Sequence, residues 1–328
     1  MMDSLSSDDI TFSIIVPTFN SESCLRHCLE HIQALNYSSS FIELLILDGG
    51  SQDHTLEIAR EFQATIISCS NINVANSRNI GARSAINDYL VFIDSDCLVH
   101  PELLNRAVGH LQQFQIMGSY YKPSPQHGWI AKTWLLAENR ISGEVRWLPA
   151  GTMILKREHF YSIGTFNESY RADEDSEFCR RARKLGYQIY NDKSVASIHL
   201  GQSDSINKFV EKEMWHASSN LRYLQEYGIR EEAFSLFLLM FLLACFAVVI
   251  YAIATINIST LVFTLIAWSG LSLLFAGIKT HRSRDLDTTT SPWIVLGRLF
   301  ILYHLYLFAR GASLIKYRQF SDISFRQI

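Results

Sequence analysis

Two long apolar segments in the C-terminal third constrain the fold most strongly. Residues 233–254 and 258–278 contain no charged side chain. A helix of about 22 residues is roughly 33 Å long, which matches a hydrocarbon core of about 30 Å. Both segments are apolar around their whole circumference, so a buried hairpin of a soluble domain fits them poorly. We therefore expect two membrane-spanning helices within a membrane domain over residues 231–328.

The segments that flank these spans are amphipathic. Residues 203–230 combine apolar and basic side chains, which predicts an amphipathic interface helix at the headgroup level. The last apolar segment, residues 292–317, is interrupted by Arg298 and Arg310. At about 100° per residue, its polar side chains lie within about 140° of one another, which favours an interfacial helix over a third span. A third span that packs on the other two would bury the same face and is the alternative.

Charge distribution predicts the orientation of the spans. The loop over residues 255–257 has no basic residue, whereas both flanks of the pair carry several. These residues are Arg222 and Arg230 before the first span, and Lys279, Arg282 and Arg284 after the second. Since basic residues stay on the cytoplasmic side, we expect an integral membrane protein whose N-terminal domain lies in the cytoplasm.

Composition excludes other classes of protein. The formal net charge is −3 and no basic block is present, so we expect no nucleic-acid partner. The six cysteines are scattered without zinc-site spacing, which indicates free thiols in a reducing compartment. Residues 1–10 are rich in Ser and Asp and lack the apolar core of a signal peptide, so we expect a disordered N-terminus.

Before residue 203, strand patterns alternate with helical ones. Apolar runs over residues 11–16, 41–47, 65–68 and 89–93 each end in polar residues, and helical periods follow the first three. Such alternation predicts βαβ units with a mostly parallel sheet. The sequence therefore predicts an α/β domain, Rossmann-like in its alternation, over residues 11–202.

Two carboxylates end the most apolar of these strands. Asp94 and Asp96 directly follow Tyr89–Ile93, and ligands of open α/β sheets bind beyond the carboxyl ends of strands. Side chains at i and i+2 share a face, so both carboxylates can reach one hard cation, or divide between a cation and nucleotide hydroxyls. An isolated Asp-x-Asp is more often a turn that caps a helix. Here Asp48 ends another strand in the same way, which favours a ligand site.

Phosphate-binding glycine loops are absent from the sequence. Neither Gly-x-Gly-x-x-Gly nor Gly-x-x-x-x-Gly-Lys occurs after a strand, so a bound nucleotide would need a metal to neutralise its phosphates. Further along, an acidic cluster over residues 173–177 begins a helix with basic residues near its end. The helix dipole favours that arrangement by itself, so capping is an alternative to catalysis there.

Five motifs, in this order and spacing, resemble glycosyltransferase family 2. They are PTFN at 17–20, DGGSQD at 48–53, NSRNIGA at 76–82, DSD at 94–96 and DEDSEF at 173–178. The chain resembles the processive-type and polyprenyl-phosphate-linked enzymes of that family over about residues 12–199. The resemblance implies a GT-A fold for residues 11–202, followed by the helical membrane domain.

The resemblance also implies roles for single residues. Four side chains would line the nucleotide pocket: Pro17, Thr18, Asn20 and Glu22. Four more would contact the rest of the donor: Asp48 and Asp53 at the base, Arg78 at the diphosphate, and Asp94 at the ribose and sugar. Asp96 would bind Mg²⁺ or Mn²⁺, and His199 would be a second metal or diphosphate contact, although a histidine after a strand is as often structural.

On the acceptor side, the family places its general base at Asp175. The other candidates on that side are Gly151, Glu174 and Trp215. The Gln-x-x-Arg-Trp motif of the polymerising synthases reads Glu213-Met214-Trp215-His216 here and lacks the Arg. This departure, together with only two expected spans, argues against a processive polymerase.

The expected activity is therefore inverting, metal-dependent transfer of one sugar to a lipid or lipid-linked acceptor. The donor would be a nucleotide-diphosphate sugar, with a UDP-sugar preferred and a GDP-sugar as the other choice, used at the cytoplasmic membrane face. One alternative is a nucleotidyltransferase that acts on a sugar phosphate. The other is a catalytically inactive, membrane-anchored protein that binds nucleotide sugars.

Overall fold

A computed structural model describes residues 10–70, 72–138, 142–217, 219–228, 233–283 and 290–315. Of the N-terminus expected to be disordered, only Ile10 lies among these residues, and it is buried. The chain divides into two compact units. The first is formed by residues up to 124 together with 140–201, and the second by residues 125–139 and 202–322.

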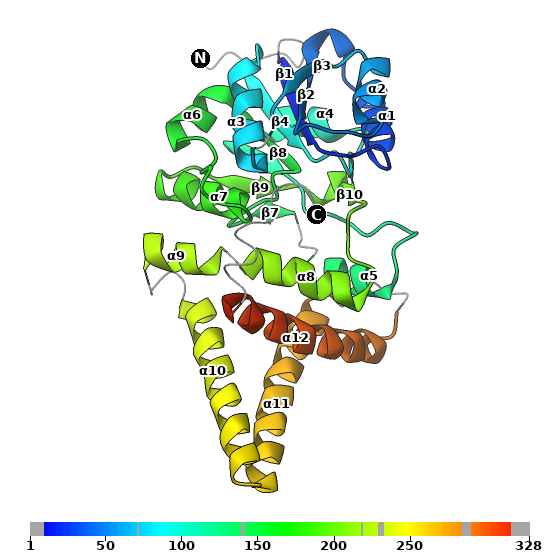
Figure 1. Cartoon of the computed structure of the whole chain (residues 1–328). Helices are drawn as coiled ribbons and strands as arrows, with labels where there is room; N and C mark the ends of the chain where they lie inside the picture. The colour runs from blue at the N-terminus through cyan, green and yellow to red at the C-terminus, as the bar shows by residue number, and fades with distance from the viewer. Residues whose placement is uncertain are drawn as a thin grey trace. The chain divides into compact units, whose positions relative to one another are not determined.

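The first unit is an α/β domain, as the sequence predicts. Four parallel strands form one half of its main sheet in the order β3-β2-β1-β4 (Figure 1). They are β1 (Phe12–Thr18), β2 (Ile42–Asp48), β3 (Thr65–Ser68) and β4 (Tyr89–Ile93). The helices between them are α1 (Leu25–Gln33), α2 (Thr55–Glu61) and α3 (Val74–Ser84). The strand, loop and helix units expected here are confirmed.

The other half of the main sheet is mixed. β8 (Thr152–Lys156) runs antiparallel to β4, and β6 (Ile116–Gly118), β9 (Ile189–Asn191) and β7 (Gly143–Glu144) follow in that order. Only β6 and β9 are parallel to each other in this half. The apolar run over residues 147–155 enters the sheet only from Thr152, because Pro149 and Gly151 lie in the turn before β8.

Further elements of this unit are the helices α4 (Leu103–His110), α6 (Arg157–Ile163) and α7 (Glu174–Lys184). Two short 3₁₀ turns, η2 (Ser39–Phe41) and η3 (Lys193–Val195), precede β2 and β10. A second sheet consists of β5 (Cys97–Leu98) and β10 (Ile198–His199), which pair antiparallel with Cys97 opposite His199. The sequence pattern does not predict this pairing, and it brings the end of the domain back to Asp96.

Two apolar cores cover the two faces of the main sheet. Ile14 of β1 belongs to one core together with Leu25 and Leu29 of α1, whereas Ile15 belongs to the other. Alternation along a strand produces this division, and it explains why β1 is buried along its whole length. On the second face, Gly81 of α3 sits so close to β1 that an added Cβ would overlap the Ile15 side chain.

The second unit is helical. Its elements are α5 (Trp129–Glu138), α8 (Ile206–Ala217), α9 (Asn220–Tyr227), α10 (Ala233–Ala254), α11 (Ile258–Ser283) and α12 (Pro292–Ile315). Within residues 203–230, where one interface helix is expected, the described residues form two helices, α8 and α9, on either side of residue 218, which lies outside the described residues. The interfacial position of this segment stays a prediction. Ser and Asn favour helix starts over helix interiors, and α9 begins at Asn220 directly after Ser219.

Two described helices are long and apolar enough to cross a membrane by length and composition. They lie at Ile258–His281 and Pro292–Arg310. Within α10, the apolar segment Leu243–Ala254 is shorter than these two. In the figure α12 runs across the α10–α11 hairpin (Figure 1).

The expected polar face of α12 contacts protein. Trp134 of α5 packs against the rings of Tyr303 and Tyr306. Arg310 Nη2 lies 3.4 Å from Glu213 Oε2 of α8. The opposite side of α12 exposes apolar side chains, namely Trp293, Ile294, Ile301 and Phe308. Residues 316 and 317 of the expected segment lie outside the described residues.

Candidate functional site

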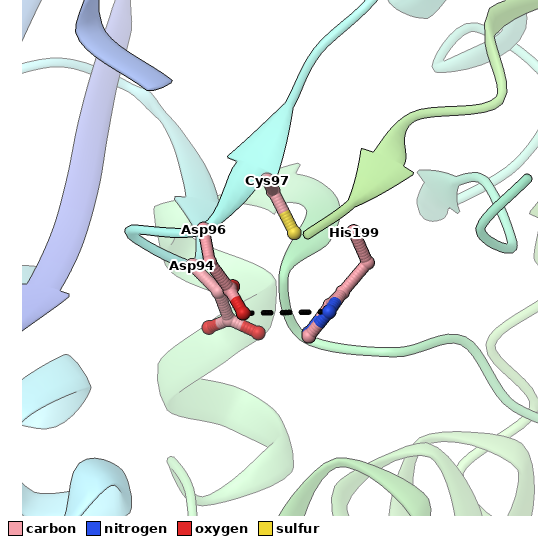
Figure 2. Close-up of side chains that lie close together, drawn as sticks. All are labelled: Asp94, Asp96, Cys97 and His199. Carbon is pink, nitrogen blue, oxygen red and sulfur yellow. Dashed lines mark ion pairs between the residues drawn. The ribbon is translucent and has the colours of Figure 1, made fainter. Parts of the chain in front are cut away.

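The carboxyl end of β4 is the centre of the candidate site. Asp94 and Asp96 follow this strand, and the β5–β10 pairing places His199 next to them (Figure 2). His199 Nδ1 lies 3.4 Å from Asp96 Oδ2. One ligand atom each from Asp94, Asp96, Cys97 and His199 lies within 4.8 Å of every other. The structure thus brings together the two carboxylates and the histidine that the sequence suggests for a metal.

The turn after β10 is shaped around Asp96. The Leu200 amide donates to the Asp96 carbonyl oxygen at 2.8 Å, and the Gly201 amide donates to Asp96 Oδ2 at 3.1 Å. A Cβ at Gly201 would overlap that carboxylate. Backbone contacts therefore fix the position of Asp96, and the same Oδ2 atom is the one that lies 3.4 Å from His199 Nδ1.

Arg78 of α3 joins two acidic residues. Its Nη2 lies 2.5 Å from Asp94 Oδ1, its Nη1 pairs with Glu174 Oε1, and the Arg78 side chain is only 4% exposed. Burial alone would lower the pKa of Arg78, but the charges of Asp94 and Glu174 outweigh it and raise that pKa above its usual range. Arg78, expected near the diphosphate, therefore holds Asp94 and Glu174 in place.

Asp175, the expected general base, is bound by two backbone amides. Its Oδ2 accepts from the Ala150 amide at 3.1 Å and its Oδ1 from the Ser176 amide at 2.7 Å. Burial, followed by the negative charge of Glu174, raises the pKa of Asp175 to about 7. A carboxylate with that pKa is ionised in half of the molecules at neutral pH, which suits a group that takes up a proton.

The turn before β8 connects Asp175 to Asp94. It supplies the Ala150 amide to Asp175, and the next residue, Gly151, leaves no room for a side chain. A Cβ there would overlap both the Asp94 carboxylate and the hydroxyl of Tyr121. Asp94 and Asp175 thus both adjoin the turn that contains Ala150 and Gly151.

The three acidic residues at the start of α7 have different partners. Glu174 pairs with Arg78, and burial raises its pKa although the Arg78 charge opposes the shift. Glu177 accepts two hydrogen bonds from Arg181, at 2.7 and 2.8 Å, within the same helix. Asp175 instead accepts hydrogen bonds from two backbone amides, those of Ala150 and Ser176. The three acidic residues therefore do not act together as one helix cap, and α7 has no capping side-chain hydrogen bond from its N-cap residue, Asp173.

Two side chains at the site were missed by sequence reasoning. Tyr121 packs its ring 4.6 Å from that of His199, and Cys97 is fully buried beside Asp96. Tyr121 reaches the site because Lys122 donates its amide to the Ser197 carbonyl oxygen at 2.8 Å, just before β10. Burial raises the pKa of both groups well above the usual range. Cys97 could have been found by its position next to Asp96, whereas Tyr121 has no local signal.

The expected nucleotide-side residues form a network between two loops. Asn20 Oδ1 accepts from the Gln52 amide at 2.9 Å, and Glu22 Oε2 accepts from the His54 amide at 3.1 Å. Both loops follow neighbouring strands, β1 and β2. Pro17 and Thr18 precede them as the last residues of β1, and the Thr18 carbonyl oxygen accepts from the Gly49 amide at 2.8 Å.

Asp48 and Asp53 accept hydrogen bonds within the same network. Asp48 accepts from the amides of Gly50 and Ser51 at 3.1 and 3.2 Å. Asp53 accepts from the Thr55 amide at 3.0 Å and from the Glu22 amide at 3.1 Å. Burial alone would raise the pKa of Asp53, but a hydrogen bond from the Thr55 hydroxyl, together with those from the two amides, outweighs it and lowers the pKa.

Trp215, the remaining acceptor-side candidate, lies in α8 of the second unit. Its ring packs 4.8 Å from that of His216.

Known proteins resemble this chain in sequence and in fold. Residues 13–170 match glycosyl transferase family 2. The glycosyltransferase AglE of Haloferax volcanii is 33% identical over 102 residues, which are 29% of this chain and 34% of that protein, so the match spans about a third of AglE. Dolichyl N-acetyl-α-D-glucosaminyl phosphate 3-β-D-2,3-diacetamido-2,3-dideoxy-β-D-glucuronosyltransferase of Methanococcus voltae is 24% identical over 229 residues, covering 61% of this chain and 70% of that protein.

Among solved structures, the mannosyltransferase PcManGT of Pyrobaculum calidifontis, in complex with GDP-Man and Mn²⁺, superposes with a TM-score of 0.62. It is 16% identical, and the superposition covers 94% of this chain and 86% of that one. The likeness shows a shared GT-A fold. Residues 13–170 thus carry a glycosyl transferase family 2 domain, and the first unit has the GT-A fold.

Proposed function

We propose that this chain transfers a sugar from a nucleotide-diphosphate donor to a lipid or lipid-linked acceptor, with the aid of a divalent cation, at the cytoplasmic membrane face. The observation that carries the proposal is the convergence of Asp94, Asp96 and His199 at the end of β4, with Asp175 held across the Ala150–Gly151 turn. Transfer of a sugar from a diphosphate to a hydroxyl requires two functions: neutralisation of the leaving group and uptake of the proton of the hydroxyl.

The donor set fits a divalent cation. Carboxylate oxygens suit Mg²⁺ and Mn²⁺, and the imidazole of His199 adds a ligand that Mn²⁺ accepts more readily than Mg²⁺. Asp96 and His199, with Asp94, would hold the ion, which when bound would supply Lewis-acid stabilisation of the departing diphosphate. Arg78 keeps Asp94 oriented for this role. The GDP-Man and Mn²⁺ recorded for PcManGT support this choice of ligands.

Asp175 is the proposed general base. Its pKa of about 7 allows it to take the proton of an acceptor hydroxyl near neutral pH. The hydrogen bonds that it accepts from two backbone amides fix the carboxylate in position. Removal of the hydroxyl proton makes the acceptor oxygen a stronger nucleophile, which attacks the anomeric carbon on the side opposite the diphosphate. If the acceptor is a lipid phosphate, it is already ionised, and Asp175 would only orient it.

Two observations support a lipid-linked acceptor. The name of the Methanococcus voltae relative describes transfer to a dolichyl-linked sugar phosphate. In the second unit, large apolar side chains such as Phe246 and Phe263 are exposed on α10 and α11, at 61% and 72%. Exposed apolar surface of that extent in long helices is favourable in lipid. Gly151 and Glu174 in the first unit and Trp215 in the second remain the proposed acceptor-side residues.

Product analysis tests the proposal. The full chain in detergent or nanodiscs would be incubated with UDP- and GDP-sugars, Mn²⁺ and a membrane lipid extract. We expect one donor to yield nucleoside diphosphate and a glycosylated lipid in equal amounts. Release of pyrophosphate would instead establish a nucleotidyltransferase. Absence of donor turnover with every sugar and lipid fraction would contradict enzymatic function and leave a nucleotide-sugar-binding protein.

A further inference from the structure

One donor of the cation cluster is not an oxygen or an imidazole nitrogen. Cys97 directly follows Asp96, and Figure 2 shows its sulfur beside the Asp96 carboxylate and the His199 ring. Its Sγ belongs to the group of four ligand atoms that lie within 4.8 Å of one another. The proposed sugar transfer assigns no task to this thiol.

The thiol is held in place by the backbone. Cys97 and His199 are direct partners in the β5–β10 ladder, and the Cys97 amide donates to the Asp94 carbonyl oxygen at 2.9 Å. The hydroxyl of Tyr121 also hydrogen-bonds the Cys97 sulfur. Two of the four donors, Cys97 and His199, therefore lie on one short ladder directly after Asp96, and a neighbouring side chain orients the sulfur, as is common around metal ligands.

A set of two carboxylates, one imidazole and one thiolate suits a different ion from the one that sugar transfer requires. Sulfur ligands select thiophilic ions such as Zn²⁺ over Mg²⁺ and Mn²⁺. Zn²⁺ takes four ligands in a tetrahedron, with Zn–S near ~2.3 Å and Zn–N near ~2.0–2.1 Å, and a site with four protein ligands has no open position. A diphosphate would find no place on such an ion.

We propose that Cys97 is a metal ligand that closes this site around a thiophilic divalent cation such as Zn²⁺, in a state that excludes the nucleotide diphosphate. The inference rests on the cation site of the proposed function and adds a fourth ligand and an inhibitory ion to it. On binding, the Cys97 thiol gives its proton to solvent and the thiolate bonds to the ion. Zn²⁺ then competes with Mn²⁺ for Asp94, Asp96 and His199.

X-ray absorption at the zinc edge tests the ligand directly. The full chain would be loaded with one equivalent of Zn²⁺, as wild type, Cys97→Ser and Cys28→Ser. Cys28 is the matched control, because it is also fully buried and lies close by, with its Sγ 3.5 Å from the Asp94 carbonyl oxygen, but is not in the cluster. We expect a sulfur shell at ~2.3 Å in wild type and Cys28→Ser, and none in Cys97→Ser.

Affinity and inhibition complete the test. Loss of a direct ligand should weaken Zn²⁺ binding by at least about a hundredfold in Cys97→Ser, since even partners of ligands contribute about 10–100-fold. Mg²⁺ affinity should not fall, and Zn²⁺ should no longer inhibit sugar transfer in this variant. The wild-type spectrum decides the question even if Cys97→Ser does not fold.

A zinc shell made of oxygen and nitrogen alone would overturn the role of Cys97 while leaving the proposed cation site intact. If wild type bound neither Zn²⁺ nor Mn²⁺, both this inference and the metal-dependent function would be contradicted.

Discussion

Carboxylates gather in two places along the carboxyl edge of the main sheet and are held there in opposite ways. At the β1 and β2 ends, Asp48 and Asp53 accept hydrogen bonds from backbone amides of residues that follow these two strands. At the β4 end, Asp94, Glu174 and Asp175 crowd around Arg78, with Asp96 and His199 next to Asp94. The first arrangement stabilises a fold without a ligand. The second gathers more negative charge than one guanidinium neutralises, which is favourable for binding a cation and for raising a carboxylate pKa.

The comparison predicts that the same chemical change has different consequences in the two places. Removal of a carboxylate from the loop network should reduce stability, and removal from the crowded cluster should reduce activity. Each of the following experiments tests one side of that division.

Asp96→Asn should give the largest effect. It removes the carboxylate that the Gly201 turn positions and weakens cation binding, so several kcal/mol of transition-state stabilisation are lost, or roughly 10⁴-fold in rate. Turnover would be measured with saturating donor and Mn²⁺. Asp53→Asn, the same substitution in the loop network after β1 and β2, is the control. Full turnover of Asp96→Asn in the presence of a chelator would contradict metal dependence.

Asp175→Asn should reduce kcat by about 10²–10⁴-fold while donor binding stays near normal, because Asn cannot accept the proton. Glu177→Gln is the matched control, since Glu177 is bound to Arg181. Its loss should lower stability by about 1–3 kcal/mol and leave kcat largely intact. If Asp175→Asn kept a tenth of wild-type turnover with a hydroxyl acceptor, Asp175 would not be the base. With a lipid-phosphate acceptor, the same result would identify the acceptor as already ionised.

The pH dependence of kcat/KM provides a smaller effect. A base must be ionised to act, and the pKa of Asp175 is raised to about 7, so activity should rise with pH through that region and fall below it. For a single group with that pKa the ionised fraction grows about tenfold between roughly pH 6 and 8. Initial rates at low donor concentration across this range would show it. A profile that stays flat down to pH 5 would mean that no such base limits the reaction.

Asp53→Ala should give the smallest effect on the reaction. It removes the acceptor of the Thr55 and Glu22 amides, which should cost about 1–2 kcal/mol of folding stability without changing kcat. The pKa of Asp53 is lowered in the folded chain, so its contribution is present above the usual value of 3.8 and is lost as pH falls below it. Thermal unfolding at two pH values measures both. Complete loss of turnover with unchanged stability would break the comparison.

The local parts of this structure could be predicted from sequence. The strands that end at Thr18, Asp48 and Ile93 and the helices that follow the first two carry clear periods, and Asp94 and Asp96 are placed by the end of a strand. Contacts between distant short segments could not. β5 and β10 have two residues each, too few for any period, yet their pairing brings His199 to Asp96. The family resemblance suggested His199 without explaining how it reaches the site.

Partner choice was equally hidden. The acidic cluster at the start of α7 looks uniform in sequence, and only tertiary contacts assign Glu174 to Arg78 and Asp175 to the Ala150 amide. The same is true of α12, whose polar face is covered by α5 and α8. In both cases the sequence points to the right side chains, but their contact partners come from distant segments and cannot be predicted from a local pattern.

The central claim is that the crowded cluster at the end of β4 binds a divalent cation that in turn binds the nucleotide diphosphate. Electron paramagnetic resonance of Mn²⁺, titrated with UDP and GDP, measures this coupling directly in wild type and Asp96→Asn. We predict that one of the two nucleotides tightens Mn²⁺ binding by about tenfold or more in wild type, a coupling of about 1.4 kcal/mol, and by nothing in Asp96→Asn. Equal Mn²⁺ binding in both proteins, unaffected by either nucleotide, would contradict it.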